Sequence, residues 1–239
     1  MGKEKLTQMR QSLKENVYLK SNAVRVGGSG DLVYFEDERD EPVKIDTILW
    51  CTGYEYSVPF LETGLESGKD GNVDKLEIST SKGRIEPLYE HLFHPRFAQS
   101  LSFIGLGFKI LPFPFFEIQS QWVARCIAGS ASLPSQEEML ESVREFYQGI
   151  EKKDPGPRGQ SMTHCMDGIQ WAYLDKITSK PGMEECEPLA DWKIKLYEIN
   201  RKKKGLHPTN YRDVTLDEEI PFMEKGLEEM NLQPPRYNS

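Results

Sequence analysis

The run from Ile45 to Tyr54, with the sequence Ile-Asp-Thr-Ile-Leu-Trp-Cys-Thr-Gly-Tyr, constrains the fold of this 239-residue chain more than any other feature. Most of the run is apolar on both faces, which is typical of a strand buried inside a parallel sheet. It ends abruptly at Thr52-Gly53-Tyr54, where a glycine lets another backbone or a ligand approach closely. A buried strand is therefore expected over residues 45–51. Its exit at Gly53 is either a tight turn alone or part of a binding site.

The first hundred residues contain signals for several more strands. Short strands are expected over residues 17–19, 23–26 and 32–35, with the glycine-rich run 27–30 as a turn and residues 37–44 as a charged connection. A second buried strand is expected over residues 101–104, just beyond this part. Strands without intervening helices, followed by a buried strand, predict a β-meander at the end of a doubly wound α/β domain.

The rest of the chain is predicted to be mainly helical. Apolar residues recur with helical spacing over residues 117–128, and Gly129 marks the end of that helix. Ser135 and Glu138 form a capping box that begins the next helix, which Pro155 ends. Two further helices are expected at about 168–179 and 188–200, a short polar helix or frayed segment at 1–16, and an irregular tail from Pro221 onward.

Composition excludes several classes of function. The net charge of −8 argues against a nucleic-acid partner bound through its phosphates. The most apolar stretch, residues 101–116, is too short to span a membrane and contains a lysine and two prolines. The four cysteines lack the close spacing of a zinc or redox motif. Reduced thiols and a cytoplasmic location are therefore expected.

Neither glycine-rich turn has the spacing of a phosphate-binding loop. Such a loop needs G-x-G-x-x-G between a strand and a helix, so that the helix N-terminus faces the diphosphate. Gly28-Ser29-Gly30 leads into another strand and has Val33 at the third glycine position. Gly105-Leu106-Gly107 follows a strand, but Ile110 takes the third position and two nearby prolines are expected to block an immediate helix. No diphosphate-binding loop is expected in this chain.

The sequence also predicts no metal site and no acid–base catalytic group. Glu90, His91 and His94 come nearest to a ligand cluster, but Pro87 and Pro95 bracket them. A helix that presents all three on one face is therefore not expected, and a solvated or locally hydrogen-bonded turn is. No serine nucleophile elbow occurs, so hydrolase chemistry has no support.

The cluster from Phe103 to Trp122 has two interpretations, and both stay open. One is a core strand followed by an amphipathic helix that packs Trp122 inward. The other is a platform for a flat heteroaromatic ring. A strand end followed by a helix start would present backbone N–H groups and Gln119 to the edge of such a ring. One helix can do both if it packs one face and presents the other.

Together these motifs resemble the flavin-containing monooxygenases, most closely the plant branch described as glucosinolate S-oxygenase-like. The resemblance covers about residues 17–215. In that family an acidic residue, here Asp46, a short apolar strand and (Cys/Ala)-Thr-Gly-Tyr close the pyridine-nucleotide domain, deep in the chain. The resemblance is therefore to the C-terminal portion of such an enzyme. The matching stretches are residues 46–61, 86–91, 101–106, 112–122, 133–139, 163–164 and 207–213.

The resemblance implies the C-terminal part of a flavoprotein with two dinucleotide-binding domains. Residues 1–55 would end the NADP domain with its β-meander, and residues 56–100 would form a connection. Residues 101–215 would supply the C-terminal strand and helices of the FAD domain, and residues 216–239 an irregular tail. FAD and NADP are the implied cofactors of the complete enzyme. The implied cofactor-binding residues are Thr52, Gly53, Tyr54, Gly105, Leu106 and Gln119, and Phe113 and Phe116 would line the substrate cavity.

The implied activity is oxygenation of a soft sulfur or nitrogen nucleophile with NADPH and O₂, of the N,N-dimethylaniline monooxygenase type, through a flavin C4a-hydroperoxide. The flavin does the chemistry, so no residue is assigned as catalytic. Small-molecule thioethers are favoured over amines, because aromatic walls without an evident cationic anchor accept a polarizable sulfur readily.

The chain also departs from the family pattern. The FAD fingerprint, the monooxygenase signature and the NADP fingerprint would all precede residue 1, and Ser161-Met162 replaces the Arg/Lys-Tyr that commonly precedes Thr-His. This chain alone is therefore expected to be inactive, and a missing N-terminal half would be its partner if the enzyme is split. The alternative is a truncated, catalytically silent relative that acts as a binding or regulatory domain.

Overall fold

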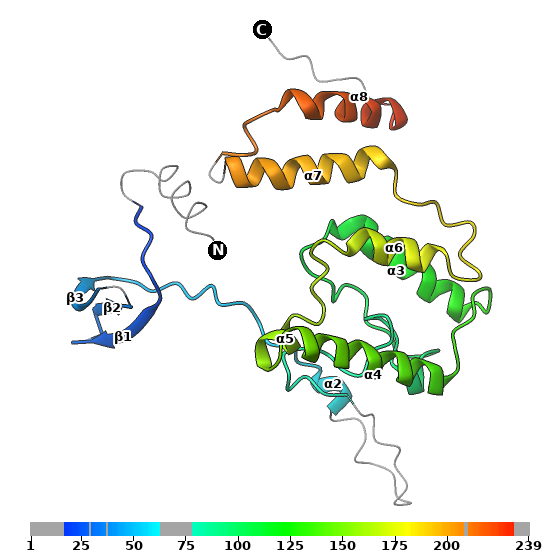
Figure 1. Cartoon of the computed structure of the whole chain (residues 1–239), viewed down its shortest axis with the longest axis horizontal. Helices are drawn as coiled ribbons and strands as arrows, with labels where there is room; N and C mark the ends of the chain where they lie inside the picture. The colour runs from blue at the N-terminus through cyan, green and yellow to red at the C-terminus, as the bar shows by residue number, and fades with distance from the viewer. Residues whose placement is uncertain (1–16, 29, 37, 63–77, 208–209, 232–239) are drawn as a thin grey trace, which may run out of the picture. The chain divides into compact units, whose positions relative to one another are not determined.

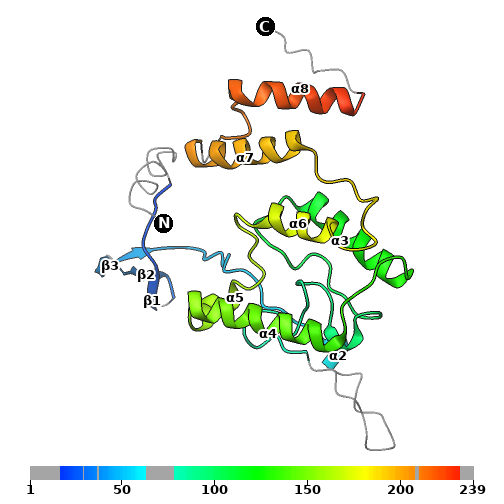
Figure 2. The ribbon, with the colours of Figure 1, turned by 45° about the vertical axis from the view of Figure 1, so that its right-hand side comes forward.

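The computed structural model describes residues 17–28, 30–36, 38–62, 78–207 and 210–231, which form a mixed α/β structure (Figures 1 and 2). The chain divides into two compact units. One comprises Met1–Thr52 together with Ala190–Ser239, and the other is Gly53–Leu189. The segment 1–16, expected to be a polar helix or frayed, lies outside the described residues. The predicted domain boundaries stay a prediction.

The first unit contains a three-stranded antiparallel sheet in the order β1-β2-β3, formed by β1 (Ala23–Gly27), β2 (Leu32–Phe35) and β3 (Glu38–Lys44). Glycines with positive φ turn the chain between β1 and β2, and the N–H of Gly30 donates to the carbonyl of Gly27 at 3.2 Å. The predicted meander is therefore present. The charged connection expected over 37–44 is wrong, because Glu38–Lys44 pairs with β2. The strand expected over 17–19 does not form.

The same unit contains a helical hairpin of α7 (Asp191–Leu206) and α8 (Ile220–Glu229), with the short 3-10 helix Asp217–Glu219 before α8. The two helices lie side by side in Figure 1, and Trp192 of α7 packs so closely on Gly226 of α8 that a Cβ there would lie 2.8 Å from the indole ring. The ammonium of Lys203 donates to both carboxylate oxygens of Glu219 at 2.8 Å, and both side chains are buried. The irregular tail expected from Pro221 onward is wrong as far as Glu229, because this segment is helical.

The second unit consists mainly of helices, with one large hydrophobic core and a smaller cluster of buried apolar residues. The expected helices at 117–128, after Ser135, at 168–179 and near 188–200 are all present, the last of them as α7 of the first unit. The core of the second unit centres on the fully buried Phe93, Phe115 and Trp122. Its helices are α2 (Pro59–Glu62), the 3-10 helix Pro95–Phe97, α3 (Pro112–Ile127), α4 (Gln136–Lys153), α5 (Pro157–Ser161) and α6 (Gln170–Thr178).

Helix α3 begins five residues earlier than the sequence predicts. Pro112 and Pro114 were expected to block a helix, but both lie in its first turn. The N–H groups of the first turn have no partner within the helix, so proline loses nothing there. The capping box at the start of α4 is confirmed: the Ser135 side chain accepts from the N–H of Glu138, and the Glu138 carboxylate accepts from the N–H of Ser135.

The two strands expected to be buried do not form in this chain. Ile48, Leu49 and Trp50 lie in extended coil with exposed fractions of 39%, 84% and 70%. Residues 101–104 make only an isolated bridge between Phe93 and Ser102. A central strand needs a neighbour on each side, and the described residues provide only the antiparallel meander. No helix in the described part is both long and apolar enough to cross a membrane.

Candidate cofactor-facing site

The loop that joins residue 104 to α3 is built around two glycines. Gly105 has φ of +91°, a conformation that favours glycine, and its N–H donates to Oε1 of Gln119 on α3 at 3.1 Å. A Cβ placed on Gly107 would lie 2.8 Å from the Phe115 ring. Glycine is therefore required at 107 for the loop to pack on the helix that follows it.

Three more hydrogen bonds fix the remainder of this loop. The N–H of Phe108 donates to the carbonyl of His164 at 3.1 Å, and the N–H of Met166 returns a bond to the carbonyl of Phe108 at 3.0 Å. The N–H of Leu111 donates to Oε1 of Gln170, the first residue of α6, at 2.8 Å. The loop is thus held to α3, to α6 and to the segment before α6.

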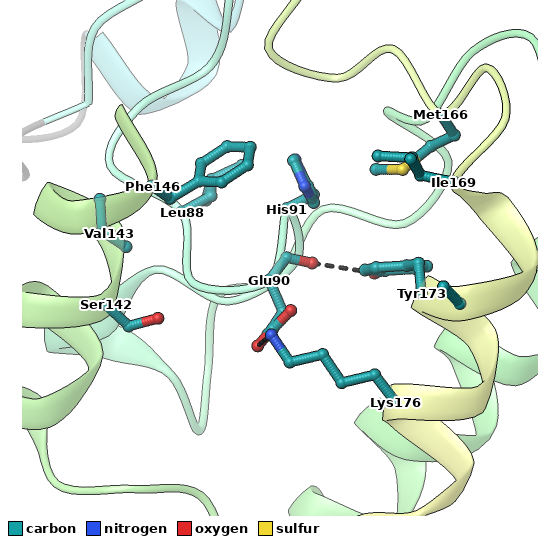
Figure 3. A pocket seen from close by; sticks show the side chains of 11 residues that line it. Leu88, Glu90, His91, Ser142, Val143, Phe146, Met166, Ile169, Tyr173 and Lys176 are labelled. Carbon is teal, nitrogen blue, oxygen red and sulfur yellow. Dashed lines mark hydrogen bonds and ion pairs between the residues drawn. The ribbon is translucent and has the colours of Figure 1, made fainter. Parts of the chain in front are cut away.

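Gln119 connects this loop to the centre of the unit. Its side chain is fully buried, and its amide donates from Nε2 to the Tyr173 hydroxyl at 2.9 Å. Tyr173 in turn donates to the carbonyl of Glu90 at 2.9 Å (Figure 3). Burial raises the pKa of the Tyr173 hydroxyl, so it remains a donor throughout the physiological range. A chain of three hydrogen bonds therefore runs from Gly105 to Glu90.

Glu90 and His91 lie in a turn that the surrounding structure holds in place. Both have positive φ, 50° and 59°, which is uncommon for residues other than glycine. The Glu90 carboxylate pairs with Lys176 at 2.5 Å and with Lys180 at 3.9 Å. The backbone conformation of this turn is thus stabilised by ion pairs on its side chain and by Tyr173 on its carbonyl.

A buried pair of histidines lies beside this turn. Nδ1 of His91 is 3.1 Å from Nδ1 of His164, and the N–H of Ile85 donates to Nε2 of His164 at 3.3 Å. Since Nε2 of the neutral His164 accepts this hydrogen bond, its Nδ1 must carry the hydrogen and donate to Nδ1 of His91. Burial lowers the pKa of His91 to about 3 and that of His164 to about 4, and the cations Lys176 and Arg84 act in the same direction. Both imidazoles are neutral at pH 7.

The histidine pair adds a residue that the sequence did not reveal. His91 and His94 are 9% and 2% exposed, so the solvated turn is wrong. The other expected alternative, a locally hydrogen-bonded turn, is present at His91, where the N–H groups of Leu92 and Phe93 donate to the carbonyl of Tyr89 at 3.0 Å. His164, 73 positions from His91, was not expected to interact with it, and no local signal could have shown the pairing. Among the described residues there is no group of three acidic, histidine or cysteine side chains able to hold a metal ion.

The structure brings three of the predicted site residues together and leaves others apart. Gly105 and Gln119 are hydrogen-bonded, and a Cβ on Gly105 would lie 3.5 Å from the Phe116 ring. Leu106 packs on a smaller cluster of Val58, Ile85 and Leu88. The remaining predicted residues, Thr52, Gly53, Tyr54 and Phe113, are exposed, Phe113 by 85%.

The loop is suited to a flat, apolar group more than to a diphosphate. Its two ends carry the exposed apolar side chains Ile104 and Phe113, at 45% and 85% exposure. The N-terminus of α3 follows immediately, but Pro112 and Pro114 have no N–H and the N–H of Phe115 donates to the carbonyl of Leu111 at 3.4 Å, so this helix start offers few N–H groups to an anion. The only other glycine-rich turn in the described residues, near Gly28, joins two strands rather than a strand and a helix.

The chain is similar to known proteins over most of its length. The family profile described as "FMO-like: Flavin-binding monooxygenase-like" matches residues 10–186. Flavin-containing monooxygenase FMO GS-OX-like 4 from Arabidopsis thaliana is 34% identical over 198 residues, which are 83% of this chain and 39% of that protein. FMO GS-OX-like 7 from the same plant is 43% identical over 227 residues, which are 94% of this chain and 44% of that protein.

A solved structure shows the same similarity in three dimensions. S-allyl-L-cysteine S-oxygenase from Allium sativum superposes with a TM-score of 0.74 and 29% sequence identity. The match covers 92% of this chain and 46% of the S-oxygenase. The chain thus spans less than half the length of the proteins that it matches.

Proposed function

We propose, from the premise that this chain belongs to the flavin-binding monooxygenase-like family, that it supplies the ring-facing C-terminal part of an S-oxygenating flavoprotein. Its relatives are plant flavin-containing monooxygenases of the glucosinolate S-oxygenase-like group. In this proposal residues 17–52 end the NADP domain, and the Gly53–Leu189 unit contributes to the FAD domain. The reaction is the oxygenation of a thioether with NADPH and O₂.

The observation that carries the proposal is the rigidity of the loop from Gly105 to Leu111. Gln119, Gln170 and the backbone of His164 and Met166 all hold it through hydrogen bonds. A loop fixed before its ligand arrives loses little entropy on binding, which is the arrangement expected of a cofactor platform. Its exposed apolar ends support a ring ligand.

The described residues fit the isoalloxazine ring of FAD but not its diphosphates. The edge of the isoalloxazine ring could be held by Gly105, Leu106 and the start of α3. Gln119 would act indirectly, because its hydrogen bond fixes the position of Gly105. Thr52, Gly53 and Tyr54 would border the nicotinamide side, and Phe113 and Phe116 the substrate. No described residue forms a loop for the diphosphates. When bound, FAD reduced by NADPH supplies O₂ activation and oxygen transfer, and this chain contributes position and exclusion of water.

Sulfur is favoured over nitrogen as the acceptor atom. The exposed apolar side chains near the loop are Ile104 and Phe113, and a polarizable thioether contacts such surfaces favourably. The lysine of the loop, Lys109, is paired with Asp167 at 3.6 Å. The solved relative is named as an S-oxygenase of S-allyl-L-cysteine. We therefore infer that small thioethers are the substrates.

A chimaera tests whether this chain can do the work of its counterpart. The part of the Allium sativum S-oxygenase that superposes on this chain is replaced by this chain, and the product is purified and desalted. We expect the chimaera to retain FAD in about equimolar amount, measured by its flavin absorbance. The 239-residue chain alone should be colourless, because ring contacts without a diphosphate loop are weak. A folded chimaera without flavin would contradict the proposal.

A catalytically silent binding domain is the second candidate. The exposed Leu49 and Trp50 favour it, because exposed large apolar side chains suit association with another protein. The chimaera separates the two candidates. A silent relative would have lost the ring-facing geometry and would not restore the flavin site, whereas the enzyme part would.

A further inference from the structure

A cavity lies between α4 and α6, within the Gly53–Leu189 unit (Figure 3). Its volume is about 260 Å³. Helix α4 contributes Val143 and Phe146 on one side, and α6 contributes Tyr173 and Lys176 on the other. The strained turn at Glu90 and His91 lies between the helices. The cavity is distinct from the platform proposed for the flavin.

The walls of this cavity are mainly apolar, with polar groups on one side. Figure 3 shows Phe146 and Leu88 opposite Met166 and Ile169, with the neutral His91 between them. Methionine adapts its shape readily to an alkyl chain. The carboxylate of Glu90 and the ammonium of Lys176 meet at the other side of the cavity. A ligand with an apolar tail and one charged group matches this division.

The arrangement of charges determines which sign the ligand should carry. The side chain of Lys180 is only 18% exposed. Its ammonium lies 3.9 Å from Glu90, donates to the Tyr89 hydroxyl at 3.1 Å and sits 4.9 Å from the Trp122 ring centre. Lys180 is therefore a fixed counter-ion for Glu90. Lys176 is a second cation, and its side chain is 58% exposed.

Lys176 can therefore turn towards a ligand without leaving Glu90 uncompensated. The carboxylate of Glu90 faces two ammonium groups, those of Lys176 and Lys180, so cations outnumber anions within this ion-pair group even though the whole chain carries −8. A second ammonium at this position would be repelled, whereas a carboxylate would gain a charge-assisted hydrogen bond. We propose that this cavity binds a medium-chain carboxylate, with its head on Lys176 and its tail between Phe146 and Met166.

The test uses the full 239-residue chain and needs no flavin, so its outcome is independent of the proposed oxygenase activity. Isothermal titration calorimetry compares sodium octanoate with octylammonium chloride and sodium acetate at low ionic strength. We expect saturable 1:1 binding of octanoate. Octylammonium lacks the right charge and acetate lacks the tail, so each should bind at least about tenfold more weakly.

Variants locate the binding. Lys176→Gln should weaken octanoate binding about tenfold, while Lys176→Arg should keep it. Ala172→Trp should abolish it by filling the cavity from the exposed face of α6, so it tests the site without touching a charge. Lys152→Gln, an exposed lysine of α4 outside the cavity, is the matched control and should bind as the wild type does. Far-UV circular dichroism confirms that each variant is folded.

Three results would overturn the proposal. One is the absence of saturable octanoate binding by the folded wild-type chain at millimolar concentration. Another is octylammonium binding as tightly as octanoate, which would assign the cavity to cations. The third is unchanged octanoate affinity in Ala172→Trp, which would place the binding elsewhere on the surface.

Discussion

Replacing Gln119 by leucine is expected to lower the free energy of unfolding of the Gly53–Leu189 unit by about 2–3 kcal/mol. The side chain is fully buried, and its amide bonds both the Gly105 N–H and the Tyr173 hydroxyl. Leucine has a similar size but leaves the Gly105 N–H without its partner. Urea unfolding followed by tryptophan fluorescence measures the change, since Trp122 is buried in the same core.

Gln121→Leu on the same helix is the matched control, because residue 121 is partly exposed. It should change the unfolding free energy by no more than about 0.5 kcal/mol. Tyr173→Phe, made in the wild type and in Gln119→Leu, completes a double-mutant cycle. The expected coupling between Gln119 and Tyr173 is about 1 kcal/mol. Equal effects of Gln119→Leu and Gln121→Leu would show that the hydrogen-bond chain contributes nothing.

Within the chimaera, Gln119→Leu should act on the reaction as well. The Gly105 loop loses its anchor, so we expect FAD to stay bound while NADPH oxidation becomes uncoupled from oxygenation and releases hydrogen peroxide. A peroxide assay beside NADPH consumption measures this. Unchanged coupling with a thioether substrate would remove Gln119 from any role at the site.

The second large effect is acid instability from the His91–His164 pair. The folded pKa values, about 3 and about 4, lie below the ordinary value of 6.5, so the unfolded chain binds more protons as the pH falls below 6.5. Stability is complete above pH 6.5 and falls by about 1.4 kcal/mol per pH unit for each histidine. Both histidines contribute to this loss of unfolding free energy down to about pH 4, and His91 alone contributes from there to about pH 3. The sum is several kcal/mol, a large fraction of the stability of a typical domain.

Urea titrations at pH 7.0, 6.0 and 5.0 measure this dependence. His91→Phe removes one titrating group, so the slope between pH 6 and pH 5 should fall by up to about 1.4 kcal/mol per pH unit. The variant should also be less stable at pH 7, because Nδ1–H of His164 loses its acceptor. Gln121→Leu, which removes no titrating group, is the control and should keep the wild-type slope. An unchanged slope in His91→Phe would show that the pair is not the source.

Local signals in the sequence were sufficient for part of the fold. The capping box of Ser135 and Glu138 placed the start of α4, because its two hydrogen bonds join residues three apart. The start of α3 was misjudged because Pro112 and Pro114 were expected to block a helix, whereas proline in the first turn removes no helical hydrogen bond. Pro221 likewise lies in the first turn of α8, in a segment that was expected to be irregular.

Features that depend on distant partners could not be predicted in the same way. The run from Ile45 to Cys51 has the composition of a central strand but is exposed coil, because the described residues offer it no neighbouring strand. The burial of Gln119 was also missed, since Gly105 and Tyr173 reach it from 14 and 54 positions away. Family resemblance identified the kind of protein where local pattern did not.

The central claim is that this chain can form the ring-facing part of a working S-oxygenase. Its most direct test is the formation of the sulfoxide from S-allyl-L-cysteine by the chimaera, with NADPH and air, measured by liquid chromatography. We predict NADPH-dependent sulfoxide formation that is lost when NADPH is omitted. A folded, flavin-loaded chimaera that consumes NADPH without forming any sulfoxide would contradict the account.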